Sequence, residues 1–178
     1  MSIPESLDSK RLKIRRFKKS DFDSFFRFLS DPKATQHLTF SEGELGRENV
    51  EAFFAEIIDS YDTSNPIFGY AVVEKSSGKY VGAMGLTALT KEKGSETIFV
   101  FLPEFWRKGY ATEAGKALFT CAFEVFSVPK IVSFLADENQ AGIRLAEKLG
   151  MEFDQMVKHR EYPKPVKRYV MTREKFLS

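Results

Sequence analysis

The chain has 178 residues, of which 43% are hydrophobic and 18 are phenylalanine, so we expect one folded domain with a substantial core. The formal net charge of +2 gives no charge-based argument for nucleic-acid binding, and the single cysteine excludes an intramolecular disulfide or a cysteine-rich metal site. The sequence shows neither a signal-peptide core nor an apolar run long enough to span a bilayer. We therefore expect a cytoplasmic protein with no membrane partner.

The N-terminal third predicts one strand followed by two helices. Residues 11–17 alternate polar and apolar side chains and predict a strand, whereas residues 1–9 before them are expected to be flexible. Ser20 can cap the first helix, and Pro32 is expected to end it. Apolar residues at helical spacing predict the second helix from about Gly46 to Tyr61.

The rest of the chain predicts a β-hairpin, a third strand, a long helix, a fourth strand, a short helix and one or two final strands. These elements occupy residues 66–89, 95–102, 109–126, 130–136, 139–150, 151–159 and 167–176. Strands that alternate with helices in this order predict a mixed α/β (α+β) sheet in a single domain over residues 1–178.

The segment between the third strand and the long helix has the composition of an anion site. The first turn of a helix carries unpaired backbone N–H groups, which can donate to a phosphate. Gly109 lets the backbone approach a ligand closely, Ala111 is small, and Thr112 adds a hydroxyl near the helix start. Taken alone, one glycine at a helix start more often marks only a tight turn. The segment matches neither the P-loop nor the dinucleotide-binding motif.

A second segment, DENQAGIRLAEKLGM, places Asn139 after a strand and at the start of the short helix. The ordinary interpretation of such an asparagine is a helix N-cap. The two segments together are far more specific than either alone.

These residues resemble the GNAT superfamily of acyl-CoA-dependent N-acetyltransferases. The sequence LPEFWRKGYATEAGKAL is similar to the acetyl-CoA signature of its ribosomal-protein N-acetyltransferase (RimJ/RimL-like) branch, and ENQAGIRLAEKLGM is similar to that branch's second motif. The resemblance covers about residues 10–173. It implies a single-domain GNAT fold with a mixed, mostly antiparallel sheet of six to seven strands flanked by helices. A splayed pair of parallel strands would hold the cofactor.

The resemblance also implies which residues bind acetyl-CoA. Gly109 and Ala111 match the superfamily's pyrophosphate motif, [Q/R]-x-x-G-x-[G/A], and Trp106 stands where Gln or Arg is usual. A bulge in the preceding strand would part the two parallel strands and admit the pantetheine arm. The implied cofactor contacts are Val100, Phe101, Leu102, Arg107, Lys108, Gly109, Tyr110, Ala111, Thr112 and Asn139. No metal is implied.

Acetyl transfer to an amine needs a neutral amine, a polarised thioester carbonyl and a leaving thiolate. Glu96, at the start of the third strand, matches the family's possible general base, although an exposed residue at a strand end is the alternative. A backbone N–H near Phe101 or Leu102 could polarise the carbonyl. The general acid is missing, because the positions where members of the family carry Tyr or Ser are here Ala146 and Gly142.

Other side chains remain open as candidates, each with an ordinary structural alternative. A hydroxyl acid could come from Tyr110, Tyr162 or Tyr169, and a base from His37 or His159. Glu42 and Glu44 could attract a cationic amine. The histidines and carboxylates show no metal-ligand spacing.

The function that we expect is transfer of acetyl from acetyl-CoA to a primary amine, such as a protein N-terminus, a polyamine, an aminoglycoside or another small metabolite. The alternative is a non-catalytic relative that binds or senses acetyl-CoA, which the missing Tyr and Ser favour. Nucleic-acid binding through the basic segment 158–168 is disfavoured. The sequence leaves open the acceptor and whether the protein is a monomer or a homodimer.

Overall fold

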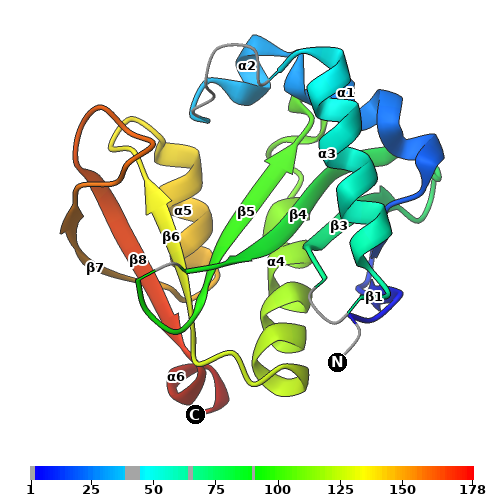
Figure 1. Cartoon of the computed structure of the whole chain (residues 1–178). Helices are drawn as coiled ribbons and strands as arrows, with labels where there is room; N and C mark the ends of the chain where they lie inside the picture. The colour runs from blue at the N-terminus through cyan, green and yellow to red at the C-terminus, as the bar shows by residue number, and fades with distance from the viewer. Residues whose placement is uncertain (1–2, 39–44, 64–65, 90) are drawn as a thin grey trace.

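The computed structural model of the chain describes residues 3–38, 45–63, 66–89 and 91–178. Within these ranges the chain forms one eight-stranded sheet with helices on both faces (Figure 1). The strands are β1 (Ser6–Asp8), β2 (Leu12–Arg16), β3 (Phe68–Glu74), β4 (Tyr80–Ala88), β5 (Ser95–Phe101), β6 (Lys130–Leu135), β7 (Glu152–Val157) and β8 (Val166–Thr172). The α-helices are α1 (Phe22–Leu29), α2 (Pro32–Thr35), α3 (Arg47–Ser60), α4 (Tyr110–Thr120), α5 (Gln140–Lys148) and α6 (Arg173–Leu177).

The sheet confirms the expected mixed, mostly antiparallel α/β architecture. Its strand order is β1-β2-β3-β4-β5-β6-β8-β7, and among the described residues the only parallel neighbours are β5 and β6. The expected count of six to seven strands was one too low, because residues 6–8 pair with β2. The expectation that residues 1–9 are flexible stays a prediction, although Ile3 is only 1% exposed and packs in the core. A three-residue strand is too short to show an alternating pattern.

The parallel strands β5 and β6 part shortly after they begin, as expected. Across these fully described strands, pairing is confined to Ser95 opposite Ile131 and Glu96 opposite Val132. Beyond that point β5 stays with β4 and β6 stays with β8, which leaves a V-shaped gap between their ribbons (Figure 1). The expected bulge in β5 is wrong, because its register with β4 is unbroken and the shift lies between β3 and β4.

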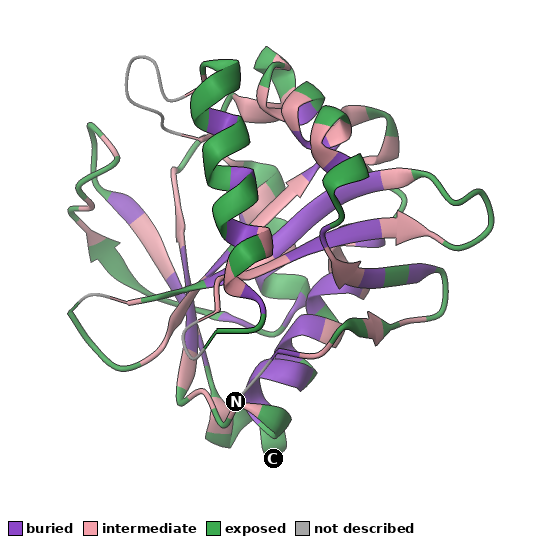
Figure 2. Ribbon diagram, turned by 45° about the vertical axis from the view of Figure 1, so that its right-hand side comes forward, coloured by how far each residue is buried: buried purple, intermediate pink, exposed green. Residues whose placement is uncertain are grey.

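The core lies between the sheet and two helical layers. On one face, the rings of Phe17, Phe25 and Phe54 meet at centroid distances of 5.0–5.5 Å and bind α1 and α3 to the sheet. On the other face, α4 buries Leu118 and Phe119, both 1% exposed. Figure 2 shows the buried central strands running between these layers. In the described part of the chain, no helix is long and apolar enough to cross a membrane.

The first helical region begins and ends differently from the prediction. Ser20 lies inside a 3-10 turn, Lys19–Asp21, and does not cap α1. Asp21 is buried and accepts two hydrogen bonds from the guanidinium of Arg15, at 2.6 and 2.9 Å. Pro32 does not end α1 but opens α2, because proline fits the first position of a helix, where no backbone N–H is needed.

The long helix ends as predicted, whereas the last strand ends earlier than predicted. The helix after the turn continues beyond Thr120 as a π-helical turn over Cys121–Val125, so its expected length to about residue 126 is confirmed. The last strand stops at Thr172, earlier than expected. Thr172 caps α6 by accepting the N–H of Lys175 at 3.3 Å.

Candidate active site

The edge of β5 determines which backbone groups face the gap. Leu102 donates its N–H to the carbonyl of Val81 at 3.0 Å. Backbone groups of alternate residues in an antiparallel strand face the same neighbour, so Val100 and Leu102 face β4, whereas Phe99 and Phe101 face the gap. The expectation that Val100 and Leu102 present their N–H groups to the cofactor, or Leu102 to the thioester carbonyl, is therefore corrected.

Trp106 ties the end of β5 to the turn that follows. Its indole N–H donates to the carbonyl of Phe101 at 2.6 Å, and the ammonium of Lys33 lies 5.7 Å from its ring. The short 3-10 helix Pro103–Phe105 makes the intervening reversal. The carbonyl of Phe101 is thereby occupied, and its N–H has no acceptor outside the strand among the described residues. The tryptophan thus has a structural role at the position where Gln or Arg is usual.

The turn at residues 107–112 presents a row of free N–H groups. Arg107 and Gly109 have positive φ angles of 61° and 78°, and Gly109 is the N-cap of α4. In the described part of the chain, no protein acceptor receives the N–H groups of residues 107–112. A turn followed by a helix N-terminus concentrates partial positive charge, which is the arrangement that binds phosphate in many proteins.

Arg11, from the β1–β2 connection, braces this turn from the opposite side. Its guanidinium donates to the carbonyl of Lys108 at 2.9 Å and to the carboxylate of Glu113 at 2.7 Å, and lies 4.7 Å from the ring of Tyr110. The C=O and N–H of a trans peptide point in opposite directions. Holding the Lys108 carbonyl toward Arg11 therefore aims the N–H of Gly109 away from it. Sequence reasoning missed Arg11, because no local pattern links it to a turn nearly a hundred residues later.

Asn139 caps α5 at the other side of the gap. Its Oδ1 accepts the N–H of Gly142 at 2.9 Å, so the N-cap interpretation is confirmed. Its Nδ2 has no acceptor among the described residues and remains available to a ligand. A Cβ at Gly142 would lie 2.7 Å from that Nδ2 and 2.9 Å from Leu135 Cδ2. Packing thus explains why α5 carries glycine here, and Ala146 offers no hydroxyl either.

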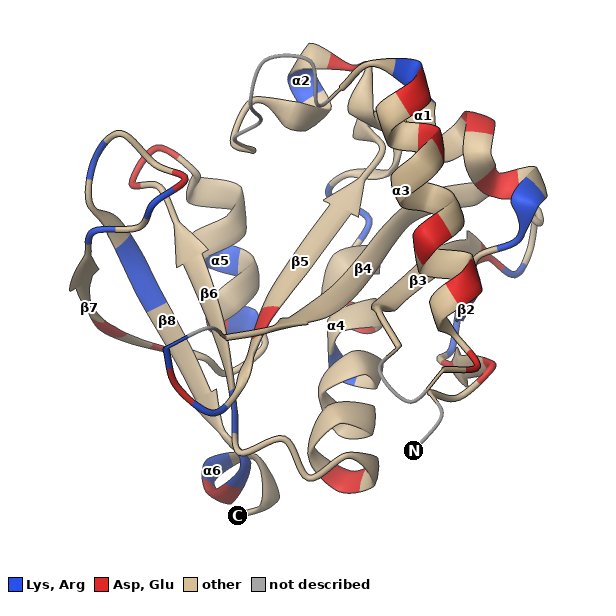
Figure 3. Cartoon of the chain, in the orientation of Figure 1, with Lys and Arg blue, Asp and Glu red and all other residues tan. Residues whose placement is uncertain are grey.

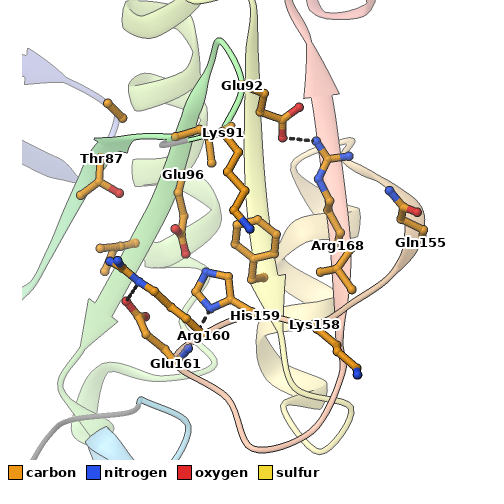
Figure 4. A pocket seen from close by; sticks show the side chains of 15 residues that line it. Thr87, Lys91, Glu92, Glu96, Gln155, Lys158, His159, Arg160, Glu161 and Arg168 are labelled. Atoms are coloured by element: carbon orange, nitrogen blue, oxygen red, sulfur yellow. Dashed lines mark hydrogen bonds and ion pairs between the residues drawn. The ribbon is translucent and has the colours of Figure 1, made fainter.

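Glu96 lies at the last paired position of β5 and β6, on the face opposite α4. Successive side chains of a strand point to opposite faces of the sheet. Phe99 of β5 packs near Gly115 of α4, so Glu96 and Ile98 point to the face away from α4. A cavity of about 600 Å³ opens there, between the start of β5, the β4–β5 loop and the β7–β8 loop (Figure 4). Burial, and then the nearby carboxylate of Glu161, raise the pKa of Glu96 to about 7. A carboxyl of this pKa can accept a proton at neutral pH.

The β7–β8 loop is held over the cavity by aromatic contacts. The ring of His159 stacks on Phe134 of β6 at 4.6 Å, and Tyr162 meets His159 edge-on at 5.6 Å. His159 Nδ1 accepts the N–H of Glu161 at 3.4 Å. Burial, followed by the carboxylates of Glu96 and Glu161, raises the pKa of Tyr162. Tyr162 therefore lies within electrostatic reach of Glu96.

The other candidates singled out in the sequence lie elsewhere. Tyr110 donates its hydroxyl to Glu74, and Tyr169 is buried with its hydroxyl 3.4 Å from Glu147. His37 lies in the turn after α2 and does not line the cavity. The acidic loop with Glu42 and Glu44 falls outside the described residues. Among the described residues, no group of three or more His, Cys, Asp or Glu side chains could hold a metal ion.

Comparison with known proteins connects this geometry to a family. The model of the acetyltransferase (GNAT) domain matches residues 11–152. The Bacillus subtilis (strain 168) protein named uncharacterized N-acetyltransferase YnaD is 26% identical over 145 residues, which cover 82% of this chain and 81% of that protein.

Two solved structures share the fold at low sequence identity. A spermidine N-acetyltransferase from Vibrio cholerae, in complex with CoA and spermine, has a TM-score of 0.80 at 17% identity, covering 94% of this chain and 99% of that one. The ribosomal-protein-S5-alanine acetyltransferase from Vibrio fischeri has a TM-score of 0.78 at 13% identity, covering 95% and 97%. Because the family model covers well over half of the sequence, the chain belongs to the GNAT acetyltransferase domain family.

Proposed function

We propose that this protein transfers an acetyl group from acetyl-CoA to a primary amine. The observation that carries the proposal is the row of unpartnered N–H groups at residues 107–112, at the mouth of the gap between β5 and β6. The pyrophosphate of CoA would accept these N–H groups, and the guanidinium of Arg107 and ammonium of Lys108 would add positive charge. Membership of the GNAT domain family supports the same cofactor.

The pantetheine arm would extend from this turn along the exposed edge of β5. The backbone groups of Phe99 and the N–H of Phe101 face the gap, so they replace Val100 and Leu102 as the proposed partners of the arm. The side-chain Nδ2 of Asn139 would donate to the arm from α5. This path leads the thioester toward the fork of the two strands, where Glu96 projects into the cavity on the other face.

The chemistry follows from these positions. A neutral amine held in the cavity attacks the thioester carbonyl carbon, and a backbone N–H on the gap-facing edge of β5 stabilises the developing oxyanion. The C–S bond then breaks, and the electron pair leaves with the CoA sulfur. Glu96 accepts the proton that the amine loses, directly or through water, which as general base catalysis contributes about 10²–10⁴-fold. Because Ala146 and Gly142 in α5 offer no hydroxyl, we propose Tyr162, which contacts His159 of the cavity lining, as a proton donor to the thiolate.

The comparisons do not select the acceptor. The two solved structures described above are named for a polyamine substrate and for a ribosomal-protein N-terminal alanine. We place this chain in the ribosomal-protein N-acetyltransferase (RimJ/RimL-like) branch on its sequence motifs, which the likeness to the Vibrio fischeri protein supports. A protein N-terminus and a small-molecule amine are both primary amines, and either fits the proposed reaction.

The alternative is a non-catalytic relative that binds acetyl-CoA without turnover, which the absence of hydroxyls at Ala146 and Gly142 favours. An assay of thiol release from acetyl-CoA with a panel of amines and peptides, with the acetylated product identified by mass, separates the two. Amine-dependent thiol release that matches the product establishes the enzyme. Binding of acetyl-CoA without release on any amine supports the alternative and refutes the proposal.

A further inference from the structure

Most charged side chains around the cavity neutralise one another. Figure 3 shows a basic stretch on β8, where Arg168 lies. Its guanidinium is bound by the carboxylates of Glu92, at 2.6 Å, and of Asp154. Glu92 is also paired with the ammonium of Lys130. These ion pairs hold the floor of the cavity together and leave it little net charge.

Two cations that line the cavity are not neutralised in this way. Lys91, from the β4–β5 loop, has no carboxylate partner among the described residues, and neither has Lys158 at the rim. Arg160 has only Glu161, at 3.7 Å, and both side chains are more than half exposed, so this pair is weak. In Figure 4 the ends of Lys91 and Arg160 lie on either side of the Glu96 carboxyl.

With Arg160 set against Glu161, the described lining of the cavity carries unpaired positive charge from Lys91 and Lys158. Burial keeps Glu96 partly protonated at neutral pH, so it balances the lysines only in part. A polycationic amine would bring like charges against Lys91 and Lys158, which is unfavourable in a partly enclosed site. An anionic group placed there would instead gain an ion pair.

We infer that the acceptor is a primary amine that carries an anionic group, a carboxylate or a phosphate, on the same molecule. The amine lies beside Glu96 and the anion meets Lys91, with Lys158 at the rim adding to the attraction. This inference rests on the proposed function, since it names the substrate class of the same site.

Matched acceptor pairs test the inference. The first is a peptide with N-terminal alanine followed by aspartate, compared with the same peptide carrying asparagine or lysine there. The second is alanine against alaninamide, and the third is phosphoethanolamine against ethanolamine. The value of kcat/KM is compared for each pair, calculated on the neutral amine so that differences in amine pKa do not enter. The pair that shows the effect identifies whether the anion is a peptide carboxylate, a free carboxylate or a phosphate.

We expect the anionic member of at least one pair to react about threefold to fivefold faster, the effect of one partly exposed ion pair, with the preference weakening at high salt. Lys91→Ala should abolish the preference and Lys91→Glu should reverse it. Lys148→Ala, a lysine on α5 outside the cavity, should preserve it.

The possible failures are distinguishable. Turnover with no preference for the anionic member in any of the three pairs, or a preference unchanged in Lys91→Glu, overturns this inference alone. Absence of turnover on every amine, with acetyl-CoA bound, overturns the proposed function and this inference with it.

Discussion

Replacing Glu96 by glutamine removes a carboxyl that the fold holds in an unfavourable environment. The pKa of Glu96 rises from an ordinary value of 4.5 to about 7, chiefly through burial. At about 1.36 kcal/mol per pH unit, the ionised form therefore destabilises the fold by about 3 kcal/mol, an upper value because solvent reaches part of the side chain.

The sign of the pH dependence follows from proton binding. Between pH 4.5 and about 7 the folded state holds a proton on Glu96 that the unfolded state has lost, so the free energy of unfolding falls as pH rises through this window. Glutamine does not ionise. We expect Glu96→Gln to gain up to about 2–3 kcal/mol over wild type at pH 8, and to gain nothing from this source at pH 4.

The Glu96→Gln substitution should lower the activity, although it raises the stability at pH 8. For an α-amine acceptor, wild-type kcat/KM should rise with pH through about 7 as Glu96 ionises. Glu96→Gln should be about 10²–10⁴-fold slower on the plateau, where wild-type Glu96 is ionised. The amine's own ionisation, near ~7.7–8, then remains as the only rising limb.

Urea denaturation at pH 4 and pH 8, together with the pH–rate profile, measures both effects. Glu124→Gln, at an exposed carboxyl outside the cavity, is the matched control and should show neither. A Glu96→Gln protein that is no more stable than wild type at pH 8, or that keeps the wild-type rate there, would refute the assigned environment and role.

Three further substitutions test the supports of the site. Arg11→Ala should weaken acetyl-CoA binding, measured by calorimetry, about fivefold to tenfold while kcat changes little, because the arginine positions the turn without touching reacting atoms. An unchanged Kd contradicts the bracing role. Asp21→Asn should lower the free energy of unfolding by about 3 kcal/mol, since it leaves the Arg15 guanidinium without its carboxylate; a loss below about 1 kcal/mol in urea denaturation argues against this pair. Gly142→Ser should lower stability by about 1–3 kcal/mol by crowding the Asn139 cap, and an equally stable variant would show that the cap adjusts.

Local signals in the sequence predicted much of the fold. The hairpin of β3 and β4 and the cap at Asn139 each depend on a few neighbouring residues, and both are present. The parting of β5 and β6 followed from the family resemblance, and only the bulge expected to cause it was wrong. Glu96 was singled out because it matches the residue that the resembled family carries at the start of this strand.

What the sequence could not supply depends on distant contacts. Whether Leu102 or Phe101 faces the gap is decided by the register with β4, which no local pattern encodes. The brace from Arg11 joins segments far apart in the chain. The raised pKa of Glu96 depends on a loop that begins more than sixty residues later and folds back over it with Glu161.

The central claim is that residues 107–112 bind the pyrophosphate of acetyl-CoA, and calorimetric titration of wild type, Gly109→Asp and Gly78→Asp with acetyl-CoA tests it most directly. Both glycines have positive φ, 78° and 68°, so aspartate strains the backbone at both sites; a Cβ at Gly109 would lie 3.4 Å from Arg11 Nη2, whereas a Cβ at Gly78 meets nothing within 4 Å. We predict that wild type and Gly78→Asp bind acetyl-CoA and that Gly109→Asp binds at least about a hundredfold more weakly. Binding by Gly109→Asp equal to wild type, or no binding by wild type, would contradict the account.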